Sequence, residues 1–136
     1  MSRVAVIGGG PAGIMAAAAA AGCGHDSVLL EKNEKLGKKL FLTGKGRCNI
    51  TNSCDTDDFF ANIPRNPKFL YSALYGFSNT DIVELINANG VPTKAERGKR
   101  VFPASDKSSD VIKALARHLN SSGAKLRLNT CLLYTS

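Results

Sequence analysis

A glycine-rich turn of pattern GxGxxG, at residues 8–13, places the strongest constraint on the fold of this chain. A short apolar run precedes the turn at residues 4–7, as expected for a buried parallel strand, and helix-forming residues rich in alanine follow it at 14–21. A second apolar run, 28–30, ends at Glu31. This order of elements predicts one βαβ unit with parallel strands.

The three glycines of the turn have separate predicted roles. Gly8 permits the tight turn, Gly10 lets the backbone approach a pyrophosphate, and Gly13 lets the helix pack closely on the strands. The free N–H groups at the start of the helix, with its positive dipole end, would then face the phosphates. The turn therefore predicts a dinucleotide-binding site.

Glu31 lies about 18 residues past Gly13, where a carboxylate can accept both hydroxyls of a ribose. The alternative is a solvated carboxylate at the end of a strand. No lysine follows the glycines as a P-loop requires, which argues against a site for a mononucleotide triphosphate. An acid at this position, rather than an arginine for a 2′-phosphate, favours FAD over NAD.

A second segment, residues 36–52, is rich in glycine, lysine and asparagine, which predicts a loop. Its glycines allow close backbone approach, its basic residues bring positive charge, and its amides can donate hydrogen bonds. Such a loop suits a ligand that carries phosphate, and the alternative is a solvated basic loop. The residues in question are Gly37, Lys38, Lys39, Gly44, Lys45, Gly46, Arg47, Asn49, Thr51 and Asn52.

Composition sets broad limits on the class of protein. The chain has 136 residues, 43% hydrophobic and 21% charged, which indicates one globular domain rather than disorder. Its formal net charge of +7 favours anionic partners. No apolar run reaches the ~20 residues of a membrane span, so we expect no membrane partner.

The first residues also argue against export. Residues 20–23 faintly resemble a lipoprotein cleavage site, but the glycines at 8–10 interrupt the apolar region that a signal peptide needs. We therefore expect a cytoplasmic protein whose cysteines are thiols. Their spacing matches no zinc pattern, and we expect no metal site. The cysteines are Cys23, Cys48, Cys54 and Cys131.

Further elements follow from periodicity and turn residues. We expect residues 55–67 to be irregular and residues 101–102 to form a short strand or turn. Helices are predicted with caps at Thr80 or Asp81 and at Ser108 or Ser109. The predicted helices are 69–75, 81–88 and 110–119, and a half-exposed strand is predicted at 125–128.

Four stretches together, GGGPAG, LLEKN, LGKKLFLTGKGRCNITN and GKRVFPASDKSSDVIKAL, resemble the BaiN-like, aminoacetone-oxidase-type NAD(P)/FAD-dependent oxidoreductases of bacteria. The resemblance extends from about residue 4 to about residue 129. Its most specific part is the block 43–52, in which Lys45 departs from the small or amide residue of the family. The fold implied is a Rossmann-like, FAD-binding α/β domain with a parallel sheet.

The resemblance implies a flavoprotein that transfers a hydride between NAD(P)H or a small organic substrate and the flavin of FAD. It assigns the ADP half of FAD to the three glycines of the turn and Glu31, and the path towards the flavin to Lys39 and the turn at 44–49. It names no catalytic residue and no oligomeric state. The implied cofactor residues are Gly8, Gly10, Pro11, Ala12, Gly13, Glu31, Lys32, Lys39, Gly44, Gly46, Arg47, Cys48 and Asn49.

The resemblance further implies that the chain is the N-terminal part of a longer protein, because family members continue into a separate domain and a second glycine-rich segment. Residues 1–130 are then an incomplete FAD/NAD(P)-binding domain, inactive without the remainder. Residues 131–136 do not continue the family pattern, and we expect them to be a non-native tail.

Two other functions fit parts of the sequence. A flavin-linked disulfide reductase would use Cys48 and Cys54, although their spacing departs from that class. A non-enzymatic module for nucleotides or nucleic acid would use the positive charge. Because no aromatic residues are interleaved with the basic residues, we expect no nucleic-acid partner.

Overall fold

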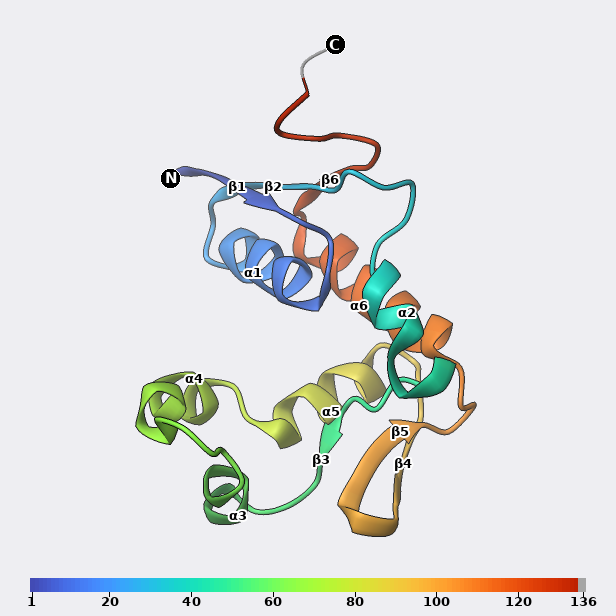
Figure 1. Ribbon diagram of the computed structural model, residues 1–136. Helices are drawn as coiled ribbons and strands as arrows, with labels where there is room; N and C mark the ends of the chain where they lie inside the picture. Colours follow the sequence, from blue (N-terminus) through green and yellow to red (C-terminus); the bar gives the residue numbers. More distant parts are fainter. Residues whose placement is uncertain (135–136) are drawn as a thin grey trace.

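The computed structural model describes residues 1–134 and contains two three-stranded sheets (Figure 1). One sheet is parallel with strand order β1-β2-β6, and the other is antiparallel with order β3-β5-β4. The predicted α/β, Rossmann-type fold is therefore confirmed. The strands are β1 Arg3–Ile7, β2 Asp26–Leu30, β3 Thr51–Asn52, β4 Thr93–Glu96, β5 Arg100–Pro103 and β6 Lys125–Arg127.

Two helices cover one face of the parallel sheet. α1, Pro11–Gly22, connects β1 to β2, and α6, Ser108–Ser122, packs against α1 and leads into β6 (Figure 1). In the register of the strands, Val28 lies opposite both Ala5 and Lys125. β2 is thus the central strand, and it pairs with a strand from each end of the chain.

The core lies between β2 and these two helices. Leu29 and Ile14 are fully buried there, together with Ala17 of α1 and Ala114 of α6. Alanines on both helices let the two backbones approach each other, which explains the run of alanines after the glycine turn. The hydroxyl of Ser27 donates a hydrogen bond to the carbonyl of Ala17 at 2.9 Å and so ties β2 to the covering helix.

The other face of the parallel sheet is open. Ile7 is 53% exposed and Ala5 is also exposed, while Val28 and Leu30 are half-buried. The prediction that β1 is a buried strand is therefore wrong. β1 lies at the edge of the sheet, and helices cover it on one face alone, so its side chains alternate between half-buried and exposed.

A second layer contains the antiparallel sheet and three helices. α5 contacts β3 and β4, and the residues of β5 are mostly buried. No helix among residues 1–134 is long and apolar enough to cross a membrane. The helices of this part are α3 Thr56–Ala61, α4 Tyr71–Gly76 and α5 Asn79–Ala88.

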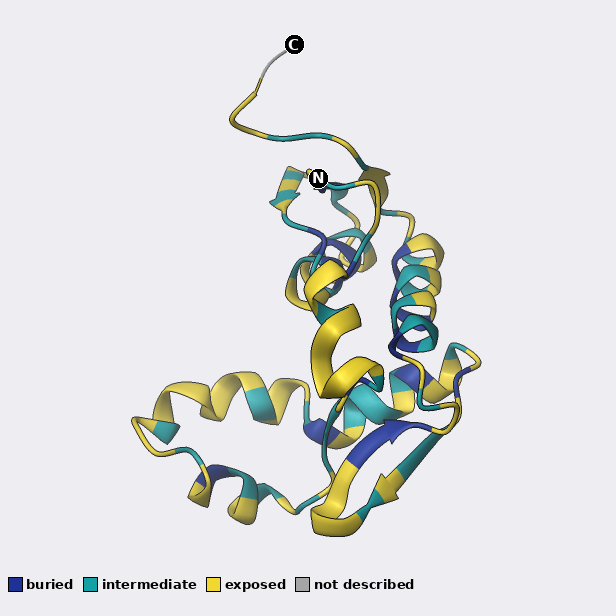
Figure 2. Ribbon diagram, turned by 45° about the vertical axis from the view of Figure 1, so that its right-hand side comes forward, coloured by how far each residue is buried: buried dark blue, intermediate teal, exposed yellow. Residues whose placement is uncertain are grey.

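α3 and α4 form a lobe that an aromatic cluster holds together. The ring centre of Phe60 lies 4.4 Å from that of Tyr71 in an edge-on arrangement and 5.8 Å from that of Tyr75 in a tilted one. Figure 2 shows the lobe as largely exposed, in contrast to β5.

Several elements differ from the sequence prediction. The segment expected to be a loop contains a short helix, α2, Lys38–Leu42, followed by a 3₁₀ turn at Thr43–Gly46. The region expected to be irregular contains α3, because Asp55 caps it by accepting a hydrogen bond from the N–H of Asp58 at 2.9 Å. β4 has no counterpart among the predicted elements.

The caps also differ. α5 begins after Ser78, which forms a capping box with Asp81, so neither Thr80 nor Asp81 is the cap. Ser108 does not cap α6 with its side chain. Its buried hydroxyl instead donates a hydrogen bond to the carbonyl of Phe41 at 2.7 Å and so joins α6 to α2.

The chain leaves β6 by crossing the end of β2. The N–H of Asn129 donates to the carbonyl of Asn33, and the N–H of Thr130 donates to the carbonyl of Glu31, both at 2.9 Å. The tail predicted at 131–136 lies partly outside the described residues, because residues 135 and 136 are not described. That the tail is non-native stays a prediction.

Candidate functional site

The glycine turn lies at the carboxyl end of β1 and leads directly into α1. Gly8 has φ of +103°, and its N–H donates to the carbonyl of Leu30 at 2.8 Å, which fixes the turn beside the end of β2. Gly10 occupies the N-cap position and Pro11 the first helical position. Since Gly10 has no side chain with which to cap the helix, the first N–H groups of α1 face outward for a ligand.

Gly13 and Gly10 differ in the space that a side chain would find at each position. A Cβ added to Gly13 would lie 1.8 Å from the carbonyl oxygen of Gly8, so glycine is required for the turn to close on the helix. A Cβ added to Gly10 would have no described atom within 4 Å. Gly13 therefore serves the packing of the turn itself, whereas the absence of a side chain at Gly10 leaves room above the helix.

The carboxylate of Glu31 lies against the turn. It accepts a hydrogen bond from the N–H of Gly9 at 3.0 Å and another from the N–H of Asn33 at 2.7 Å, and the residue is 8% exposed. These donors, Asn33 first, hold the pKa of the Glu31 carboxyl below its usual range, although burial opposes the shift. Each oxygen keeps a lone pair for a further donor such as a ribose hydroxyl.

Gly9 belongs to the turn as well, although the predicted motif leaves this position unspecified. A Cβ there would lie 2.6 Å from a methyl group of Leu36 and 3.1 Å from the side chain of Glu31. The carbonyl of Gly9 accepts a hydrogen bond from the N–H of Gly37 at 2.9 Å. The signal in the sequence is the unbroken row of three glycines, whose middle member leaves room for the side chains of Leu36 and Glu31.

The hydrogen bond between Gly9 and Gly37 also brings the second segment, residues 36–52, to the glycine turn. Gly37 is buried with φ of +69°, and a Cβ there would lie 3.0 Å from Ile112 of α6. α2 starts at the next residue, and Lys39 on it is exposed, as is Lys32 after β2. Neither lysine forms an ion pair within residues 1–134. Their charges are thus free for an anionic ligand.

The end of α2 runs into a tight turn at residues 43–49. Gly44 has φ of +56°, and a Cβ there would lie 2.8 Å from the backbone nitrogen of Asn49. Gly46, with φ of +85°, borders open space. The side-chain amide of Asn49 is placed to donate to the carbonyls of Thr51 at 3.0 Å and Val101 at 3.3 Å, which ties the turn to β5.

Cys48 lies inside this turn and is 1% exposed, with φ of +59°. Burial raises the pKa of its thiol, and a hydrogen bond with Thr43 opposes the shift. Cys54 is half-buried, and both cysteines are free thiols. A buried thiol with a raised pKa is a poor nucleophile, so the geometry does not favour the disulfide-reductase alternative.

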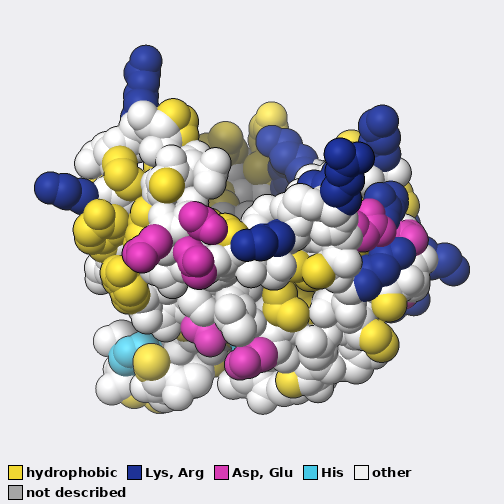
Figure 3. Space-filling model, turned by 90° about the horizontal axis from the view of Figure 1, so that it is seen from below, with side chains coloured by type: hydrophobic (Ala, Val, Ile, Leu, Met, Phe, Trp, Pro, Cys, Tyr) yellow, Lys and Arg dark blue, Asp and Glu magenta, His cyan; other side chains and the backbone are white. Residues whose placement is uncertain are grey.

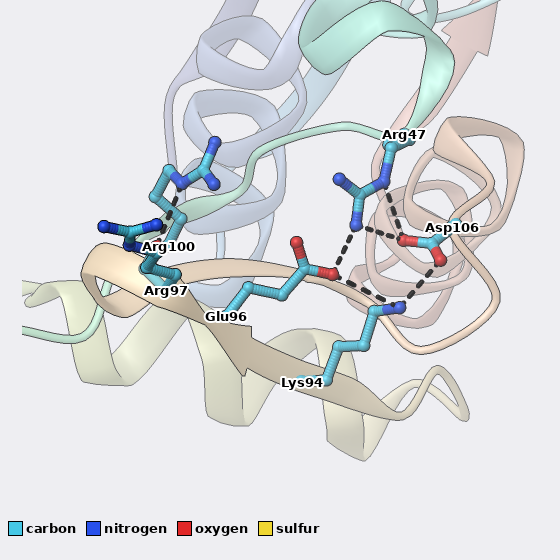
Figure 4. A network of polar contacts seen from close by, with 6 residues as sticks. All are labelled: Arg47, Lys94, Glu96, Arg97, Arg100 and Asp106. Atoms are coloured by element: carbon cyan, nitrogen blue, oxygen red, sulfur yellow. Dashed lines mark hydrogen bonds and ion pairs between the residues drawn. The ribbon is translucent and has the colours of Figure 1, made fainter.

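The side chain of Arg47 lies in a network of charged side chains (Figure 4). Its guanidinium donates to Asp106 at 2.7 and 2.9 Å and to Glu96, and Lys94 donates to Asp106 at 2.7 Å. It also stacks on the ring of Phe102, 4.0 Å from the ring centre. The predicted role of Arg47 as a cofactor contact stays a prediction, and the structure gives its charge two carboxylate partners.

These partners hold together three separate segments of the chain. Arg47 lowers the pKa of Glu96 through a hydrogen bond, and Lys94, then Arg47, do the same for Asp106. β4, the loop before α6 and the turn at 43–49 are thereby joined. Nothing in the local sequence marks this network, because its members lie far apart along the chain.

The structure brings the predicted site residues into two groups. The first group surrounds the ends of β1 and β2, and α2 connects it to the second group, which lies beside β5. The first consists of Gly8, Gly10, Pro11, Ala12, Gly13, Glu31 and Lys32, and the second of Gly44, Gly46, Arg47, Cys48 and Asn49, with Lys39 between them.

A parallel sheet with a glycine turn at the end of β1 and an acid at the end of β2 defines a Rossmann-type domain. The chain belongs to the family described as "HI0933-like protein Rossmann domain", which matches residues 2–135. The resemblance based on the sequence motifs is confirmed by this match.

Curated relatives share this part of their sequence. The chain is 36% identical over 128 residues to a 3-dehydro-bile acid delta(4,6)-reductase of Clostridium scindens, covering 93% of the chain and 31% of the relative. It is 29% identical to a ribosomal RNA dihydrouridine synthase of Escherichia coli, covering 94% and 31%. The chain thus spans about a third of the length of these relatives.

Solved structures share the fold. The chain resembles the THI4 protein of Thermovibrio ammonificans with a TM-score of 0.60 at 14% identity, covering 93% of this chain and 37% of that one. It resembles a flavocytochrome c3 fumarate reductase with a TM-score of 0.59 at 22% identity, covering 94% and 27%. At this level of identity the likeness concerns the fold.

Proposed function

We propose that the chain is the dinucleotide-binding part of an FAD-dependent oxidoreductase. The observation that carries the proposal is the position of the Glu31 carboxylate, which lies against the Gly9 N–H at the point where β1 turns into α1. An acid so placed can accept the hydroxyls of a ribose whose pyrophosphate lies over Gly10.

The residues present fit the ADP half of FAD. Gly10 leaves open space above the start of α1, and the N–H groups of Ala12 and Gly13 are the first that the helix offers to a pyrophosphate, because Pro11 has none. Glu31 keeps acceptor capacity for the ribose. The free charges of Lys32 and Lys39 would add to the attraction for phosphate.

When bound, FAD supplies hydride transfer, and the protein positions and tunes the flavin. We propose NAD(P)H as the electron donor and a cytoplasmic location. The names of the two relatives differ in substrate, a bile acid and ribosomal RNA, but both describe reduction of a carbon–carbon double bond. We propose the same reaction class here, on a double bond conjugated to a carbonyl group.

A titration of the purified chain with ADP, FAD and FMN tests the cofactor proposal. If the turn and Glu31 hold the ADP half, calorimetry should show ADP and FAD competing for one site, while FMN, which has no adenosine, does not compete. FMN binding as strong as that of FAD would contradict the proposal, as would a lack of competition between ADP and FAD.

A further inference from the structure

A cleft lies between α3 and the turn that joins β4 to β5. Its volume is about 760 Å³, within the range of small-molecule sites. Asp58 and Phe59 of α3 and Asn62 just after it line one side, and Gly98 and Lys99 line the other from the turn. These residues have no part in the proposed dinucleotide site.

Three basic residues of the turn carry free charges. Arg97, Lys99 and Arg100 are exposed, and none of them pairs with a carboxylate within the described chain. The neighbouring acid, Glu96, pairs with Arg47 and Lys94 instead. The charge of Glu96 is therefore already neutralised, and the tip of the β4–β5 hairpin, residues 97–100, keeps a positive charge.

The tip is also ordered by its own contacts. The Nε of Arg100 donates to the carbonyl of Arg97 at 3.1 Å, and the Arg100 guanidinium lies 5.7 Å from the ring centre of Phe102. Figure 4 shows Arg97 and Arg100 beside each other and apart from the ion-pair network. Seen from below, basic side chains gather over the β4–β5 side of the molecule and acidic side chains over α3 (Figure 3).

The opposite wall of the cleft offers a ring and hydrogen-bond acceptors. Phe59 is half-buried and can stack with a flat ligand. Asn62 donates its amide to the carbonyl of Asp58 at 2.8 Å, and its own amide oxygen and the Asp58 carboxylate accept no hydrogen bond within residues 1–134, so both keep their acceptor capacity. These acceptors suit the N–H groups of a nucleobase and repel a phosphate. The cleft thus has one side for phosphate and one for a base.

We propose that this cleft binds single-stranded nucleic acid, with one base stacked on Phe59 and phosphates on Lys99, which lines the cleft, and on Arg97 and Arg100 beside it. Such strands are bound by cationic grooves with aromatic platforms. The sequence predicts no nucleic-acid partner because aromatic and basic residues are not interleaved, but the fold places Phe59 and Lys99 in one cleft. An anionic membrane surface fits less well, because the aspartates at the start of α3 would face it.

Fluorescence anisotropy with labelled 12-mers of oligouridylate and of oligothymidylate tests the proposal and distinguishes RNA from DNA. Arg97→Gln, Lys99→Gln and Arg100→Gln together remove three phosphate contacts, so the slope of log K against log salt should become less negative by about 2. Phe59→Ala should weaken binding about tenfold through lost stacking. Both variants should keep the melting temperature of the wild type within a few degrees.

The matched control removes the same charge elsewhere. Lys35→Gln, Lys113→Gln and Arg127→Gln change three exposed cations that make no ion pair within residues 1–134, and this variant should keep the wild-type slope. If both triple variants weakened oligonucleotide binding equally, net charge alone would explain the loss of affinity, and the proposal would be overturned. No binding of either oligonucleotide, or binding to phosphatidylserine vesicles instead, would also overturn it. Unchanged ADP binding in the hairpin variant separates this test from that of the dinucleotide site.

Discussion

The Cα of Gly13 faces the carbonyl oxygen of Gly8 so closely that a Cβ would approach this oxygen to 1.8 Å. The contact joins the first turn of α1 to the end of β1, and no rotation of a side chain can relieve it, since the atom belongs to the backbone. Two glycines of one motif therefore depend on each other sterically.

Gly13→Ala should consequently destabilise the fold. We expect a loss of about 3 kcal/mol in the free energy of unfolding by urea, because the turn must move off the helix. Gly22→Ala, in the same helix, is the matched control. A Cβ there has no described atom within 4 Å, and we expect a gain of up to about 1 kcal/mol. Equal effects of the two substitutions would contradict the steric interpretation.

Gly10→Ala should separate binding from stability. The new methyl group enters open space and the φ of −77° suits alanine, so we expect a change in unfolding free energy below about 1 kcal/mol. The same methyl group would occupy the space proposed for the pyrophosphate, and ADP affinity measured by calorimetry should fall at least tenfold. Gly22→Ala should leave that affinity unchanged, and an ADP affinity that survives Gly10→Ala would exclude this position for the pyrophosphate.

Glu31 should make the stability depend on pH. Its pKa is lowered in the folded chain by hydrogen bonds from Asn33 and Gly9, so the unfolded chain takes up the proton first. The stabilisation is present above the ordinary value of 4.5 and is lost as the pH falls through the lowered pKa. Thermal melting of Glu31→Gln should give a lower melting temperature at pH 7 and a flatter decline in acid.

Glu84→Gln is the control for this experiment. Glu84 is exposed on α5, and its carboxylate accepts no hydrogen bond within the described chain. We expect its replacement to leave the pH profile of the melting temperature unchanged. A Glu31→Gln variant that declines in acid as steeply as the wild type would show that other carboxylates govern the profile.

Arg47→Ala should lower the melting temperature but preserve ADP affinity. Its loss removes the bonds that join the turn at 43–49 to Asp106 and Glu96, and it leaves those carboxylates to Lys94 alone. Arg97→Ala, which removes an arginine without a carboxylate partner, should leave the melting temperature unchanged. A marked loss of FAD affinity with Arg47→Ala, with ADP affinity preserved, would favour the contact near the flavin predicted from the sequence.

Cys48 should resist alkylation in the folded protein. It is buried and the pKa of its thiol is raised, whereas Cys23 is exposed. Mass spectrometry after brief treatment with iodoacetamide should find Cys23 modified at least tenfold faster than Cys48. In urea the two rates should converge. Rapid alkylation of Cys48 in the native state would reopen the disulfide-reductase alternative.

The sequence predicts the glycine turn well because each of its requirements is local. The spacing of the glycines, the alanines behind them and Glu31 all act within one βαβ unit, and the structure brings them together. Ser78 could also have been found, since it stands three residues before Asp81 in a capping-box pattern.

Other features depend on contacts that the sequence does not encode locally. α3 is short and its region contains two prolines, and it persists through the packing of Phe60 on Tyr71. β4 carries mostly polar residues and becomes a strand because it pairs with β5. The carboxylate partners of Arg47, Glu96 and Asp106, lie far from it along the chain, so the sequence alone predicts a cofactor contact for its charge. The exposure of β1 follows from the order of the strands.

The pairing of β2 with β6 also has a consequence for biosynthesis. Val28 is translated early, but its neighbour Lys125 leaves the ribosome only after every helix of the described chain has been made. Until then the strand that contains Leu29 has one unpaired edge in the nascent chain. Pairing between residues distant in sequence is slow, and an unpaired strand edge is prone to aggregation. Synthesis rate, as much as affinity for a cofactor, should therefore govern how much of this protein reaches its native state.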